Sequence, residues 1–409
     1  MKKKKQPPQK NKQVSRSDLQ RKSLDKPSII VLAAAAVVFL LALFWLHSED
    51  ILQGAGKIFW VYGDEIVEFE KGTITEIVSD DKTADEVADG AYTGTQEITV
   101  KVKTGQFKGE VMTAHNYFGP LSGVPLSVGD SVTLTLKTHA DGSHTVTVYE
   151  FNRIPILAAF LVLFFLVIVL VGGRTGLKSL VGLIFTVICL FMILIPLLYK
   201  GAPTVLTTFA VCSYIALVSF TILGGVHRKT ISAFLGTVSG MILAMLFGLA
   251  VQRIAKIDGL RLEDAEALMQ MKYVGAVVKV RGLLVAGIIV SALGAVMDVA
   301  MSISSALEEV HAANPALKQQ DLFKSGMNIG RDMVGTMTNT LILAFLGCEF
   351  TLMLFFYARE MTFYQLYSSA FVAIETISGL ASSLGMILAI PLTALISSTL
   401  ITQKQKKKT

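Results

Sequence analysis

Long uninterrupted runs of apolar residues dominate the chain. One run occupies residues 28–46, and seven more follow residue 153 in close succession. These seven cover residues 154–172, 177–198, 203–224, 231–252, 282–306, 331–356 and 365–400. A helix needs ~20 apolar residues to cross the hydrocarbon core of a bilayer, and each run is close to that length or longer. The pattern predicts a polytopic α-helical membrane protein with about eight transmembrane helices.

Residues 47–152 follow a different pattern, in which apolar and polar residues alternate. The alternating stretches are 72–78, 97–103, 132–137 and 144–149, and glycine-containing turn pairs separate them. A period of two is typical of strands that bury one face. We therefore expect about five short strands here, which would form a small all-β domain. Either an OB-like barrel or a sandwich would fit this number of strands.

Positive charge gathers at the two ends of a chain whose net charge is +6. Because cytoplasmic segments of membrane proteins are rich in Lys and Arg, both termini are predicted to be cytoplasmic. Residues 1–27 and 403–409 would then be basic cytoplasmic tails, the first one disordered. Residues 28–46 would be an uncleaved signal-anchor helix and the β-domain would be extracellular. We expect these tails to contact anionic lipid headgroups of the bilayer rather than nucleic acid.

The loop 253–281 does not fit this topology well, because it places six basic residues on the predicted outer side. An amphipathic helix lying at the membrane interface would account for it. Its apolar face would be Leu268, Met269, Met271, Val274, Val277 and Val278. The alternative is that the spans are miscounted here.

Motifs of soluble enzymes are absent from the sequence. The stretch 173–179 resembles a phosphate-binding loop, but Leu177 separates its glycine from its lysine. The stretch 308–311 lacks the second histidine of a zinc-binding helix. The three cysteines all lie in apolar runs and none lies in the β-domain. We therefore predict no enzymatic activity, no cofactor and no metal site.

Polar residues interrupt the last three apolar runs, and each run carries a carboxylate. Insertion of an ionised carboxylate at the bilayer centre costs ~2.5–3.5 kcal/mol, so such residues are functional candidates. The predicted ion or proton path consists of Asp298, Ser302, Ser305, Asp332, Thr336, Asn339, Glu375 and Ser382. Structural alternatives exist for two of them. Asp332, beside Arg331, can be a solvated helix start, and Glu375 can hydrogen-bond a neighbouring helix.

Two functions from different classes fit this pattern. The leading hypothesis is a transport or export permease, coupled to protons through Asp298, whose β-domain receives or guides the substrate. The alternative is a membrane scaffold or sensor that does not transport. In that case the β-domain binds an envelope partner, and the polar residues only join the helices. The protein partner that we expect is an envelope protein or another copy of this chain.

Several segments of the sequence resemble the YibE/F-like family of bacterial membrane proteins. The segments are 172–183, 224–230 with 236–237, 298–305 and, most specifically, 325–343. The resemblance covers residues 55–400 and implies a multi-span protein of the plasma membrane, chiefly of Gram-positive bacteria, with no established function.

The last three apolar runs are also similar in layout to half of a resistance-nodulation-division permease or its protein-export relatives. The corresponding places are occupied by Asp298, the segment 307–330, Arg331 with the threonines that follow it, and the segment 379–385. The chain departs from that layout in having eight predicted spans rather than six and a small outer domain.

Overall fold

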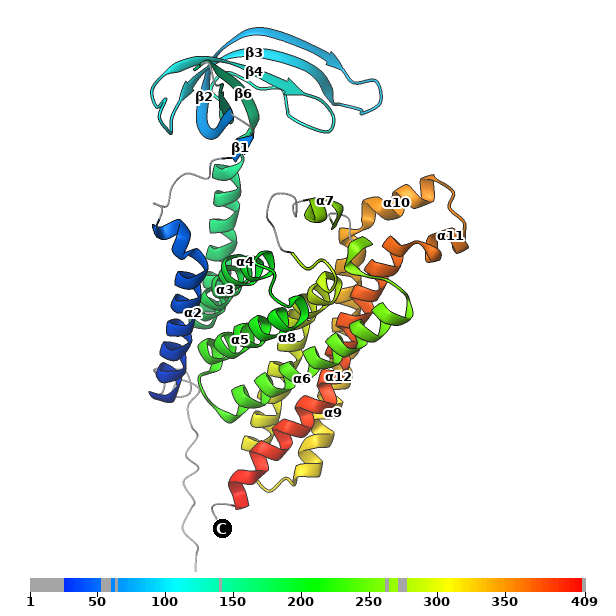
Figure 1. Cartoon of the computed structure of the whole chain (residues 1–409). Coiled ribbons are helices and arrows are strands. Elements are labelled where there is room, and N and C mark those ends of the chain that lie inside the picture. The colour runs from blue at the N-terminus through cyan, green and yellow to red at the C-terminus, as the bar shows by residue number, and fades with distance from the viewer. Residues whose placement is uncertain are drawn as a thin grey trace, which may run out of the picture. The chain divides into compact units, whose positions relative to one another are not determined.

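The structure is a computed structural model that describes residues 26–52, 60–62, 65–139, 142–261, 265–270 and 278–406. It divides into two compact units, which Figure 1 shows in one colour scale. One unit comprises residues 50–170, and the other comprises residues 1–49 and 171–409. Most of the predicted N-terminal tail and the last three residues of the C-terminal tail lie outside the described residues.

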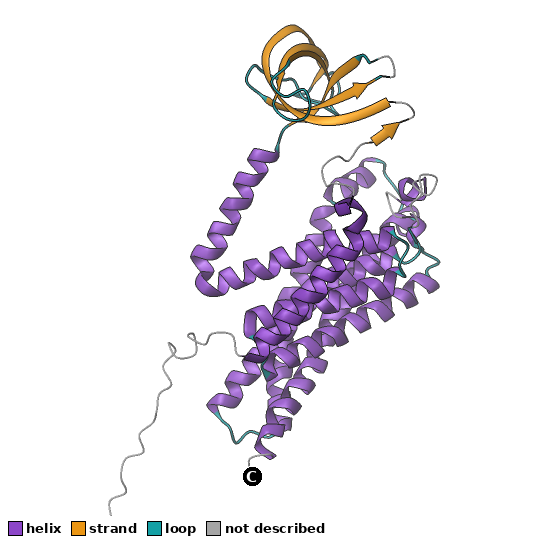
Figure 2. Cartoon of the chain, turned by 60° about the vertical axis from the view of Figure 1, so that its left-hand side comes forward, coloured by secondary structure: helices purple, strands orange, loops and turns teal. Residues whose placement is uncertain are grey.

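The first unit is a small β-barrel. Its strands are β1 Trp60–Tyr62, β2 Glu65–Ala84, β3 Tyr92–Val102, β4 Val111–Phe118, β5 Ser131–Thr138 and β6 His144–Phe151. Strand β2 pairs with both β3 and β5, which closes strands β2 to β6 into a ring in the order β2-β3-β4-β6-β5. The β4–β6 pair is parallel and the other pairs are antiparallel. Figure 2 shows the strands curling around a common interior.

Strand β2 can pair with two neighbouring strands because it is long and bends. Its first part pairs with β5 and its second part with β3, and both pairings include Gly72 and Thr73. Register shifts follow at Ile74/Glu76 and Ile77/Ser79, and such bulges bend a strand. A Cβ at Gly72 would lie 2.7 Å from the Leu134 side chain, so glycine is needed where the strand bends over the core. That core is apolar and includes Ile98, Val100, Val132 and Leu136.

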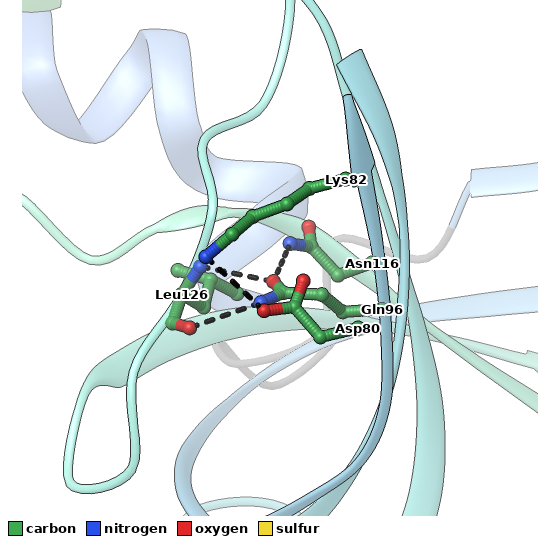
Figure 3. A network of polar contacts seen from close by, with 5 residues as sticks. All are labelled: Asp80, Lys82, Gln96, Asn116 and Leu126. Carbon is green, nitrogen blue, oxygen red and sulfur yellow. Dashed lines mark hydrogen bonds and ion pairs between the residues drawn. The ribbon is translucent and has the colours of Figure 1, made fainter. Parts of the chain in front are cut away.

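A buried polar network joins the loop before β5 to the barrel (Figure 3). The Gln96 side chain accepts hydrogen bonds from Asn116 and from the Leu126 backbone N–H, and it donates one to the Leu126 carbonyl. The Asn116 amide also donates to the Val124 carbonyl. Both amides are only 2% exposed, so these hydrogen bonds fix the loop 119–130 across the barrel.

Replacement of Gln96 by Leu is expected to lower the free energy of unfolding of the barrel by ~2–3 kcal/mol. The physical reason is that Leu126 and Asn116 would keep buried polar groups without their partner, and each such group costs ~1–3 kcal/mol. Limited proteolysis of the purified full chain across a urea series measures the effect. Thr95→Leu, at the exposed neighbouring position, is the control. Equal urea midpoints for the two variants would contradict the expectation.

The second unit is a helical bundle, and two of its helices, α2 and α3, extend into the residues of the barrel unit. The helices are α2 Lys26–Leu52, α3 Ile154–Cys189, α4 Ile195–Tyr199, α5 Thr204–Gly224, α6 Arg228–Ile254, α7 Ala265–Gln270, α8 Leu283–Ala313, α9 Gln319–Cys348, α10 Phe350–Ala358, α11 Phe363–Ser368 and α12 Ala370–Lys406. A π-helical turn, Leu190–Leu194, connects α3 to α4. Helix α2 packs on α5, where the Tyr214 hydroxyl donates to the Ala35 carbonyl at 2.6 Å.

Several of these helices are long and apolar enough to cross a membrane. Among the described residues there are six, or seven if α9 and α10, which meet at a bend of 61°, form one span. The difference from the eight predicted spans lies at residues 154–199, which form one helical run instead of two separate helices. Gly173, with φ 55° and ψ −132°, interrupts that run close to the predicted break. The count of eight therefore stays a prediction.

Helix α8 is the centre of the bundle. It packs against α5, α6, α9 and α12 (Figure 1). Helices α6, α8 and α12 approach closely because α6 and α12 carry glycine at their crossing. A Cβ at Gly240 would lie 2.7 Å from the Val296 side chain and 2.8 Å from the Ala389 side chain. Small residues at such positions permit close packing of membrane helices.

Three segments differ from their predicted bounds. Helix α8 continues to Ala313 and α9 begins at Gln319, so the predicted segment 307–330 is a helical hairpin that continues both spans. The last predicted span divides into α11 and α12 at Ser369. In the loop 253–281 the structure has the six-residue helix α7 and an apolar cluster of Ala265, Val278 and Val280. Residues 271–277 of the predicted interfacial helix lie outside the described residues.

Candidate functional site

Contacts between α8, α9 and α12 show how the three helices are aligned. They therefore determine which residues lie at the same depth, that is, at the same level along the helix axes. Hydrogen bonds join Ser291 to Ser382 and Ser304 to Ser397, so α8 and α12 run parallel. Helix α9 runs antiparallel to both. Its Gly326 lies against Leu307 and Ala394, and its Gly330 lies against Ile303 and Ile390.

The structure does not bring Asp298 and Glu375 together. Asp298 follows Ser291 by seven residues, whereas Glu375 precedes Ser382 by seven residues. At a helical rise of about 1.5 Å per residue, the two carboxylates are ~21 Å apart along parallel helices. The sequence correctly indicates that both residues belong to neighbouring helices, but it does not show the offset between those helices. A path that includes both carboxylates must therefore extend along the bundle.

Asp298 lies on an exposed face of α8. Ser302, one turn away, is exposed as well, and Ser305 is half-buried. The opposite face of α8 carries the buried residues Val296, Val299 and Ile303. Two glycines, Gly287 and Gly294, share the exposed face, and a Cβ at either would meet no heavy atom within 4 Å.

The candidate residues of α9 also point away from the bundle. Asp332, Thr336 and Asn339 are all exposed, whereas Gly326 and Gly330 form the buried side of the helix. Thr336 donates a hydrogen bond to the carbonyl of Met333, a bond within its own helix. Five of the eight candidate residues, three on α9 and two on α8, are thus on outward faces of the chain.

Ser382 is buried and joins two helices. Its hydroxyl hydrogen-bonds Ser291 on α8 and donates to the Ser378 carbonyl at 2.9 Å. A second pair, Ser304 with Ser397, joins the same two helices at 3.0 Å further along. These hydrogen bonds connect α8 and α12 at two positions along their length.

Glu375 lines a cavity of about 500 Å³ at the end of the bundle where α12 begins. A second carboxylate, Glu349, lines the same cavity at the junction where α9 and α10 meet at 61°. The remaining walls are apolar and aromatic, and they include Phe345, Phe356, Tyr357 and Tyr367. Glu349 is not among the site residues predicted from the sequence. Its position inside an apolar run, shortly before the end of a predicted span, is the signal that could have found it.

The fold defines the class of this protein before any comparison is made. Long apolar helices in a tightly packed bundle, preceded by a small β-barrel, are typical of a polytopic helical membrane protein.

Comparison with known proteins identifies the family. Residues 160–403 match the model of the YibE/F-like proteins, and residues 64–151 match the model of the N-terminal domain of the YibE/F family. The chain belongs to the YibE/F-like family, which confirms the resemblance seen in the sequence. No curated protein and no solved structure matches it.

Proposed function

We propose that this protein is an export permease of the bacterial plasma membrane, and that its substrate is an amphiphile with a positively charged group. The observation that carries the proposal is the cavity between α9, α10, α11 and α12, which is lined by Glu349 and Glu375. The cavity adjoins two helix breaks, one between α9 and α10 and one between α11 and α12. Transporters of several folds build their substrate sites at such discontinuous helices.

The lining of the cavity supports this class of substrate. Apolar walls favour burial of a hydrocarbon or aromatic body. The two carboxylates supply negative charge for a cation, and aromatic faces attract cations as well.

Asp298 is the group that we propose to couple transport to protons. It is an acidic residue within an apolar helix, and such residues mark proton relays in many pumps and transporters. It is distant from Glu375, but the Ser291–Ser382 and Ser304–Ser397 pairs join its helix to the helix of Glu375. Protonation of Asp298 would then act on the cavity by shifting α8 and α12 together.

We infer that the β-barrel is of the OB type and that both termini are cytoplasmic, which places the barrel outside. The order of strands around the ring, with a parallel pair between the third and fifth barrel strands, supports the assignment to the OB type. Barrels of this type bind extended ligands on one sheet face and its loops. The barrel would receive or guide the substrate after it leaves the bundle.

Binding of tetraphenylphosphonium, an amphiphilic cation, tests the proposed cavity. The double variant Glu349→Gln, Glu375→Gln is expected to bind it about tenfold or more weakly than the native chain in detergent, because a charged partner contributes ~1.5–3 kcal/mol. Glu360→Gln is the control, since Glu360 is exposed in the α10–α11 turn and does not line the cavity. Equal binding by the double variant and the control would contradict the proposal, and so would the absence of binding by the native chain.

A further inference from the structure

The outward faces of α8 and α9 carry polar and small residues where a membrane helix facing lipid would carry large apolar ones. The face on α8 consists of Gly287, Gly294, Asp298 and Ser302, and the face on α9 consists of Asp332, Gly335, Thr336 and Asn339. We call these two surfaces the α8 face and the α9 face. Within the described part of the chain, neither the Asp298 carboxylate nor the Asn339 amide has a hydrogen-bond partner.

The two faces lie at the same depth in the bundle. Contacts of Gly326 with Leu307 and of Gly330 with Ile303 fix the antiparallel alignment of α9 and α8. Counted along both helices from these contacts, Asp298 shares its depth with Gly335 and Thr336, and Ser302 shares its depth with Asp332. Asn339 lies one turn further, level with Gly294.

The two faces also complement each other chemically. The α8 face supplies a carboxylate acceptor and two glycines, at which a Cβ would meet no atom of the chain within 4 Å. The α9 face supplies the Asn339 amide as a donor, with its own open glycine at Gly335. Lipid tails offer no donors, and a carboxylate that faces them is costly. Small residues and polar side chains together are what membrane helices use to associate.

We propose that a second copy of this chain covers both faces. A two-fold axis along the membrane normal would preserve depth, so the α8 face of one copy would lie against the α9 face of the other, twice. Asp298 would then accept a hydrogen bond from the partner's Asn339. The polar environment of Asp298 is complete only in the dimer, because this donor comes from the other copy.

Disulfide cross-linking between two differently tagged copies in native membranes tests this arrangement. One copy carries Ser302→Cys and the other carries Asp332→Cys, and both carry Cys348→Ser because Cys348 is the exposed native cysteine. Copper phenanthroline is expected to link the two tags. The control replaces Ser302→Cys with Leu235→Cys. Leu235 is 41% exposed on α6 and lies at nearly the same depth as Ser302, as the contacts of Gly240 and Gly248 with α8 show.

A cross-linked product at least fivefold above the control supports the proposal, and a yield equal to the control overturns it. A second measurement addresses the hydrogen bonds. Asn339→Leu, added to both copies, is expected to lower the yield severalfold, and an unchanged yield would remove Asn339 from the interface. The mass of the native chain in lipid nanodiscs provides an independent check. It is expected to be that of two copies, and a single-copy mass overturns the dimer whether or not the chain transports.

Discussion

Asp298→Asn is expected to abolish proton-coupled transport while the chain still folds and reaches the membrane. Asparagine has nearly the same shape as aspartate and keeps a hydrogen-bonding carbonyl, but it cannot bind and release a proton. If protonation of Asp298 drives the transport cycle, a residue that cannot be protonated removes the coupling step. The effect is then larger than a partial loss of substrate affinity. We therefore expect a loss of transport of at least a hundredfold, which corresponds to ~2.7 kcal/mol or more in the driving step.

The measurement is uptake of tetraphenylphosphonium into proteoliposomes under an imposed pH gradient. Glu309→Gln is the matched control, because Glu309 is also exposed on α8, about three turns from Asp298 toward the end of the helix. The control is expected to transport like the native chain. Native-like, gradient-dependent uptake by Asp298→Asn would eliminate Asp298 as the coupling residue.

Gly240→Leu is expected to destabilise the helical bundle by more than ~3 kcal/mol, which is beyond the usual cost of overpacking because three neighbours obstruct the new side chain. A Cβ alone would lie 2.7 Å from Val296, 2.8 Å from Ala389 and 3.1 Å from the Gly385 carbonyl oxygen. That oxygen belongs to the backbone of α12 and cannot move without shifting the helix. Leucine has a higher helix propensity than glycine, so local propensity acts in the opposite direction.

Thermal unfolding in detergent, followed by size-exclusion chromatography, measures this effect. The control is Gly347→Leu, at an exposed glycine of α9 where a Cβ would meet no atom within 4 Å. We expect a large loss of monodisperse protein on heating for Gly240→Leu and little change for Gly347→Leu. Similar melting of both variants would mean that α6, α8 and α12 do not pack as described.

The barrel illustrates how far alternation in the sequence can predict strands. The turns at Gly105, Gly129 and Gly142 all have positive φ, as their glycines indicate. Strand β4, Val111–Phe118, was missed because its alternation is broken at several positions. Its buried positions include the polar Asn116, while Val111 and Tyr117 are exposed. Burial of Asn116 depends on Gln96, which is distant in the sequence, so local alternation could not reveal it.

The helical bundle illustrates a different limit. Spacing along a helix shows that Asp298 and Ser302 share a face, but it does not show whether that face meets another helix of the same chain. The buried face of α8 is set by the close approach of α6 and α12 at Gly240 and Gly385, which is a tertiary property. The offset between α8 and α12, which separates Asp298 from Glu375, is likewise fixed only by packing and by the serine pairs.

The most direct test of the proposed function is transport by the native chain in purified form. Proteoliposomes with an imposed pH gradient are expected to accumulate tetraphenylphosphonium, and a protonophore is expected to abolish that accumulation. Uptake equal to that of protein-free liposomes, with or without the gradient, would contradict the account of this protein as a proton-coupled permease.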